Sequence, residues 1–137
     1  MVNEIYKKFY DLALGQYDVD AFIKDVLSTK DLLLVDRLSF QAFCCALLAD
    51  KTKDILQIKQ YFKEVCEYLN QSLSIDNEGY TPHLVRLMIE SHMHDAQFID
   101  HRPEDSHFIK SYAGADVNPY LVRLGKELIE NLPQSTK

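Results

Sequence analysis

Apolar residues recur every three or four positions along almost the whole chain, and this spacing constrains the fold more than any other feature of the sequence. In the longest such segment they are Ile55, Ile58, Phe62, Val65 and Leu69. Apolar residues at this spacing form one buried face of a helix. No segment alternates clearly with a period of two, and no Asn-Gly pair marks a hairpin, so strands are not expected. The chain therefore predicts an all-α fold.

Turn and cap residues divide this pattern into separate helices. Gly15 is a natural helix end, Asp18 and Thr52 can each cap the helix that follows, and Pro103 suits the first position of a short helix. Asn118 can cap the last helix, and Pro119 follows it at the first helical position. We expect a single-domain bundle of about six to eight short-to-medium helices over residues 1–137, with about five frayed residues at the end.

Composition narrows the classes of partner. The chain has 137 residues, of which 47% are hydrophobic, and this is enough for one real core. The net charge of −6 argues against nucleic acid and against anionic membranes as partners, since both attract cationic surfaces. No apolar run approaches the roughly 20 residues that span a bilayer, and the first residues lack the layout of a signal peptide. We expect a cytoplasmic protein whose charge permits a basic protein partner.

The three cysteines do not form a recognisable catalytic or metal motif. Cys44 and Cys45 lie in an apolar run, and Cys66 follows in the next predicted helix. We interpret them as free thiols buried as small hydrophobic residues. The chain also lacks a glycine-rich phosphate loop and a nucleophile elbow, so we expect neither a catalytic residue nor a cofactor.

Two stretches of the chain resemble each other, "TPHLVRLMIE" from Thr81 and "NPYLVRLGKE" from Asn118. We interpret them as two similar capped helix starts, and whether they form a true repeat stays open. In both, an arginine precedes a glutamate by four positions on the predicted outer face, as in Arg86 and Glu90. This order is the weaker one for a pair within a helix, so a tertiary or partner contact explains it better.

An acidic, histidine-rich region is the strongest local signal. Residues 71–107 contain all five histidines, seven acidic residues and two basic residues, and therefore hold five of the six excess negative charges. We expect a helix from Thr81 to about Ile99. In helical projection His83, Arg86 and Glu90 share a polar stripe, which we interpret as a solvated face.

A metal site is one alternative for this region. The run "HMHD" offers imidazole and carboxylate ligands, and the candidate ligands are His92, His94, Asp95 and His101. They would make the protein a small metal-dependent hydrolase or a metal-binding regulator. The H-E-x-x-H motif of metalloproteases is absent.

The interpretation that we favour is a non-enzymatic, acidic binding module. Its most concrete form is an immunity or antitoxin protein that occludes the cationic active-site cleft of a basic toxin, such as a nuclease, because an acidic face speeds encounter with a cationic one. The predicted partner-binding residues are Asp76, Glu78, Tyr80, Arg86, Glu90, Asp95, Asp100, Glu104 and Asp105. A helical scaffold subunit of a larger assembly is a further alternative.

Overall fold

The computed structural model describes residues 2–91, 101–112 and 117–131, and these residues form seven α-helices and no strand. The predicted all-α bundle of short-to-medium helices is therefore confirmed. The helices are α1 (Val2–Ala13), α2 (Val19–Ser28), α3 (Leu34–Lys51), α4 (Ile55–Ile75), α5 (Tyr80–Ser91), α6 (Arg102–Ser111) and α7 (Pro119–Asn131).

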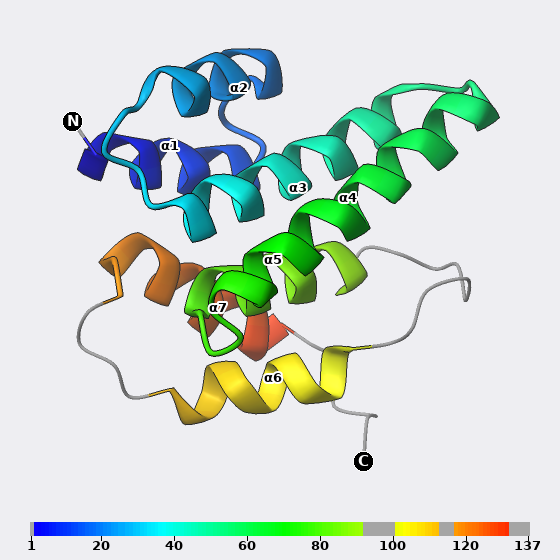
Figure 1. The fold of residues 1–137 in the computed structure, drawn as a ribbon. Coiled ribbons are helices and arrows are strands. Elements are labelled where there is room, and N and C mark those ends of the chain that lie inside the picture. Colours follow the sequence, from blue (N-terminus) through cyan, green and yellow to red (C-terminus); the bar gives the residue numbers. More distant parts are fainter. Residues whose placement is uncertain (1, 92–100, 113–116, 132–137) are drawn as a thin grey trace.

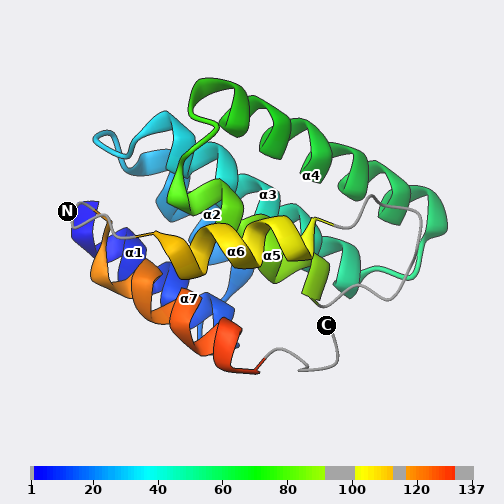
Figure 2. The same ribbon diagram turned by 90° about the horizontal axis from the view of Figure 1, so that it is seen from below.

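Helix α5 lies at the centre of the bundle. Helices α3 and α4 form a long antiparallel hairpin, with α1 and α2 against α3 and with α6 and α7 below (Figure 1). Seen from below, α6 lies over α5 (Figure 2). Nine of the twelve residues of α5 are buried, because α3, α4, α6 and α7 all contact this helix.

Aromatic rings build the core on the α1–α3 side. Phe9 of α1 stacks on Phe40 of α3 with ring centroids 4.4 Å apart, and Phe22 and Phe43 pack edge-on or tilted around them. Such aromatic contacts stabilise a core beyond the area they bury. A hydroxyl bridge extends this packing to the hairpin, where Ser39 and Ser72 lie 3.0 Å apart, Oγ to Oγ.

Most of the predicted helix boundaries are confirmed. Gly15 has a φ of 76°, which suits the residue that ends a helix. Asp18 accepts a hydrogen bond from the amide of Ala21, and Asn118 accepts one from the amide of Tyr120. Helix α6 has its proline at the start, as expected.

The start of α4 differs from the prediction. Asp54, not Thr52, is the N-cap, and its carboxylate accepts a hydrogen bond from the amide of Leu56. The hydroxyl of Thr52 instead accepts from the amide of Asp54, in the turn before the helix. Ile55 is exposed, although its spacing predicts burial. The physical reason is that the tip of the α3–α4 hairpin extends beyond the other helices (Figure 1).

Helix α5 also begins earlier than predicted. It starts at Tyr80, and Thr81, expected as its cap, is buried within the first turn. Its described part ends at Ser91, and the predicted extension to Ile99 lies outside the described residues, as do the last residues expected to fray. Within the described ranges, no helix combines the length and the apolar character needed to cross a membrane.

Candidate functional site between helices α5 and α6

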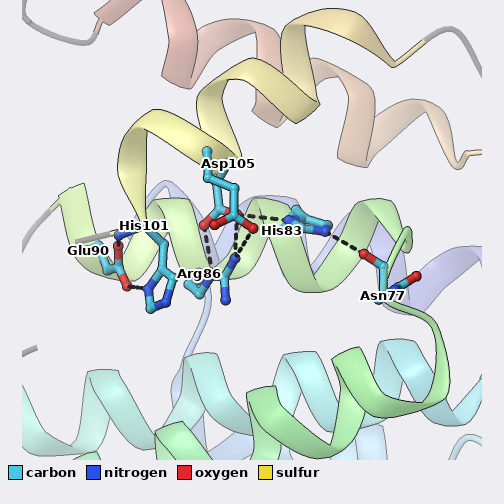
Figure 3. A network of polar contacts seen from close by, with 7 residues as sticks. Asn77, His83, Arg86, Glu90, His101 and Asp105 are labelled. Carbon is cyan, nitrogen blue, oxygen red and sulfur yellow. Dashed lines mark hydrogen bonds and ion pairs between the residues drawn. The ribbon is translucent and has the colours of Figure 1, made fainter. Parts of the chain in front are cut away.

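A buried polar network joins α5 to α6, and Asp105 is at its centre (Figure 3). The residue is 0% exposed. Its carboxylate accepts hydrogen bonds from Nε and Nη2 of Arg86, both at 2.8 Å, and lies 2.8 Å from Nδ1 of His83. This two-pronged arginine contact is the strong form of a charge-assisted hydrogen bond.

The geometry favours the charged form of His83. Its Nδ1 faces the carboxylate of Asp105, and its Nε2 lies 2.8 Å from the backbone carbonyl oxygen of Asn77. An ionised carboxylate and a carbonyl can only accept hydrogen bonds, so both ring nitrogens must donate. The contacts therefore favour the imidazolium form of His83, whose ring stacks on Phe108 with centroids 4.0 Å apart.

The pKa values of the network agree with these charges. Burial disfavours the charged form of His83, but its hydrogen bonds to Asp105 and Asn77 outweigh burial and raise its pKa above the ordinary value. Burial also acts against the ionised form of Asp105, yet the hydrogen bonds from Arg86 and His83 hold its pKa below the usual range. Both partners are thus held in their charged forms.

Two further acids complete the network at its edges. Nη2 of Arg86 lies 3.4 Å from the exposed carboxylate of Glu104. At the other end, Glu90 accepts a hydrogen bond from the amide of His101 and lies 2.7 Å from Nδ1 of the same residue. The cations Arg86 and His83 therefore face two carboxylates of α6, of which Asp105 is buried and Glu104 is exposed.

Helical spacing explains why α5 supplies these groups. His83, Arg86 and Glu90 follow each other by three and four positions and so share one face. This is the polar stripe that the sequence predicts, but it is not a solvated face. Helix α6 covers it, and the first turn of α6 carries Glu104 and Asp105.

The second copy of the related stretch makes its own tertiary contact. The guanidinium carbon of Arg123 lies 5.7 Å from the centroid of the Tyr10 ring, and the Tyr10 hydroxyl lies 3.1 Å from a carboxylate oxygen of Glu127. In each copy the arginine and the glutamate contact another part of the chain, Asp105 and His101 in the first copy and α1 in the second. The prediction of a tertiary contact is confirmed. The prediction of an outward-facing pair is wrong for Arg86 and Glu90, which are partly buried, whereas Arg123 is exposed as predicted.

Three side chains of the described residues could in principle surround a metal ion. Ligand atoms of His83, Glu104 and Asp105 all lie within 4.8 Å of one another. The guanidinium of Arg86, however, already occupies both oxygens of Asp105, and a second cation would have to compete with it. The geometry favours an ion-pair cluster over a metal centre.

The ligands named in the sequence lie elsewhere. His92, His94 and Asp95 are outside the described residues, and His101 pairs with Glu90. The metal hypothesis for that set stays a prediction.

The predicted partner-binding residues fall into separate groups. Asp76, Glu78 and Glu104 are exposed. Tyr80 and Asp105 are buried, so the expectation that their side chains lie on a binding surface is wrong. The carboxylate of Asp105 is bonded to Arg86 and His83 within the chain. Tyr80 packs against the ring of Tyr112 and against α7.

The remaining predicted residues occupy other positions. Arg86 and Glu90 are partly buried in the contact with α6 and with His101, and Asp95 and Asp100 lie outside the described residues.

The thiols are placed as the apolar pattern predicts. Cys44 and Cys45 are buried and free, and Cys66 is partly buried. Burial raises the pKa of Cys44 and of Cys45 to about 12. A thiol that stays protonated is a poor nucleophile, so these residues act as packing groups.

Sequence reasoning missed the partnership of Asp105 with Arg86 and His83. The signal for this contact was present in the sequence. One predicted helix carries His83 and Arg86 on one face, and the next begins with Glu104 and Asp105. Which of the two acids is buried depends on the face that α6 turns toward α5, and that face carries Asp105.

The chain matches no protein-family model, and comparison with curated proteins and with solved structures found no significant match.

Proposed function

We propose that this protein is a non-enzymatic, acidic binding module of the immunity or antitoxin type. It neutralises a basic toxin, such as a nuclease, by covering the cationic cleft in which that toxin holds its substrate.

The observation that carries this proposal is that the fold buries some of the acidic groups and leaves others exposed. The groups suited to acid–base chemistry, His83 and Asp105, are buried and bonded to each other and to Arg86. The carboxylates of Asp76, Glu78 and Glu104 stay in solvent. Exposed acids of this kind attract a cationic surface and speed association, whereas the buried network holds the elements that carry them.

The network also organises this acidic surface. Asp76 and Glu78 flank Asn77, whose carbonyl oxygen is held by His83. His83 in turn contacts Asp105, the neighbour of Glu104 in the first turn of α6. Asp76, Glu78 and Glu104 are therefore each next to a residue of the buried network. This reduces the entropy that is lost when a partner binds.

A pull-down with the tagged protein at low salt tests the proposal. We expect a basic protein in stoichiometric amount, which raising the salt concentration releases, because exposed charges are screened. Mass spectrometry then identifies the partner. A preparation that retains no basic protein contradicts the proposal.

Charge-neutralised variants test the surface itself. The triple variant Asp76→Asn, Glu78→Gln, Glu104→Gln should slow association with the captured partner by about tenfold and weaken its salt dependence. The matched control neutralises three exposed acids elsewhere. It is Asp50→Asn, Glu67→Gln, Glu130→Gln, with the same change in net charge. Equal association rates for the two variants would mean that only net charge matters and that these acids are not the contact surface.

A further inference from the structure

Four large apolar residues near the start of α3 are exposed. They are Leu27 in the last turn of α2, Leu33 and Leu34 at the start of α3, and Ile75 at the end of α4. Their exposed fractions lie between 52% and 67%. Single exposed apolar residues are ordinary on protein surfaces, but a group of them marks an interaction site. We call these four residues the helix-end patch.

Hydrogen bonds bring the three helix ends of this patch together. The guanidinium of Arg37, in the first turns of α3, donates to the carbonyl oxygens of Val26 and Thr29 at the end of α2. From the other side, the hydroxyl of Ser72 donates to the carbonyl oxygen of Val35 at 2.9 Å. Arg37 thereby links the end of α2 to the first turns of α3, and Ser72 links the last turns of α4 to the same part of α3.

These bonds place the apolar residues next to their anchors. Leu27 follows Val26, Leu34 precedes Val35, and Ile75 lies one helical turn beyond Ser72. The same bonds hold the backbone of the helix ends in place, which suits a preformed docking surface.

The charge around the patch is negative. The two segments 28–39 and 72–79 contain three exposed acidic residues, Asp31, Asp76 and Glu78, and one exposed basic residue, Lys30. Their fourth acidic residue, Asp36, is buried and accepts a hydrogen bond from the Tyr6 hydroxyl. The guanidinium of Arg37 is already committed to the carbonyls of α2. The carboxyl ends of α2 and α4 add the negative ends of two helix dipoles, against the positive end of one dipole at the start of α3.

We propose that the helix-end patch docks an amphipathic segment of a partner protein in which apolar side chains are flanked by lysine or arginine. The apolar residues would bind in the centre, and Asp31, Asp76 and Glu78 would pair with the basic residues at the rim. The inference rests on the proposed function, because it takes the partner to be a basic protein. It adds that the contact is centred on apolar residues of α2, α3 and α4 and not on the acidic surface alone.

A synthetic amphipathic helix of leucine and lysine is a suitable probe, with a matched peptide of leucine and glutamate as its control. We expect the basic peptide to shift the amide resonances at the end of α2, the start of α3 and the end of α4. The acidic peptide should leave them unchanged.

A pair of variants then locates the binding. The first variant removes the centre of the patch by the substitutions Leu33→Gln, Leu34→Gln and Ile75→Gln. Its affinity for the basic peptide should fall by at least about tenfold. Ile55→Gln, Leu56→Gln is the control at the other end of the hairpin, where these residues are 68% and 77% exposed. It should bind as the unchanged protein does. All five substitutions are at exposed positions, so both variants are expected to fold.

Equal loss of binding in both variants, or resonance shifts confined to the hairpin tip, would overturn the proposed patch. The natural partner separates this failure from failure of the proposed function. A basic partner that binds the patch variant with unchanged affinity refutes the patch alone. If no basic partner is captured, the proposed function fails, whatever the peptide does.

Discussion

Replacing Asp105 by asparagine is the sharpest test of the buried network. Asparagine keeps the shape of the side chain but removes the negative charge. The carboxylate is 0% exposed and is contacted by two nitrogens of Arg86 and one of His83, all at 2.8 Å. The substitution therefore leaves two cations in the interior without their common counter-ion.

The expected loss follows from the geometry. Removing one member of a buried ion pair costs about 3–5 kcal/mol. Two features place Asp105→Asn at the lower end of this range. Glu104 stays within 3.4 Å of Arg86, and His83 can release its proton to become neutral. We expect a loss of about 3 kcal/mol in the free energy of unfolding at neutral pH, a large part of the stability of a small domain.

Urea unfolding followed by circular dichroism measures this loss. At an m value of about 1.5 kcal/mol per molar, the midpoint should fall by about 2 M. Glu104→Gln is the matched control, since it removes the neighbouring carboxylate, whose side chain is 65% exposed, and should cost no more than about 0.5 kcal/mol. A loss below about 1 kcal/mol for Asp105→Asn, or equal losses in the two variants, would refute the view that the buried carboxylate holds α6 to α5.

Three further predictions concern His83 of the same network, Gly125 and the buried cysteines. The pKa of His83 is raised in the folded state, so its stabilising contribution should be complete below the unfolded pKa of about 6.5 and should disappear as the pH rises through the folded pKa. Unfolding free energies measured across this pH range should show that decline in the unchanged protein, and a His83→Gln variant that retains it would contradict the prediction. Gly125→Ala should lower the melting temperature, because an added Cβ would lie 2.2 Å from the hydroxyl of Tyr80, and this overpacking outweighs the roughly 1 kcal/mol gain in helix propensity. Adding Tyr80→Phe should restore part of the loss, and strict additivity in calorimetry would show that the hydroxyl is not the obstacle. Cys44 and Cys45, with pKa values of about 12, should react with a thiol reagent only after unfolding, so rapid labelling of the native protein would disprove their burial.

Much of the fold follows from local signals. The spacing of apolar residues predicts the helices, and Gly15, Asp18, Pro103 and Asn118 mark ends that the structure confirms. These signals work because a cap or a turn residue acts on backbone groups within a few positions of itself. At the start of α4 the sequence pattern predicted Thr52 as the cap and the structure has Asp54, because the pattern alone does not fix which polar side chain reaches the free amides of the first turn.

The candidate site followed from the sequence only in outline. The acidic, histidine-rich region and the stripe of His83, Arg86 and Glu90 are visible in the sequence, but the stripe alone does not say what covers it. Helical projection assigns polar residues to solvent by default. Asp105 reaches the stripe from 22 positions beyond His83 and turns it into an interior ion-pair cluster.

Residues that look equivalent in the sequence also have different structural roles. Of two adjacent acids at the start of α6, Asp105 is buried and Glu104 is exposed. Of two related stretches, one supplies Arg86 to that cluster and the other places Arg123 over an aromatic ring of α1.

The sequence by itself determined that this chain forms helices, where most of them begin and end, and that its excess charge is concentrated in one region. Those properties depend on contacts within a few residues and on composition. Only the tertiary structure decided which charges are neutralised inside and which remain on the surface, and which apolar helix ends stay uncovered. The physical reason is that burial depends on the packing of helices distant in the chain, and an ion pair forms only where that packing brings opposite charges together.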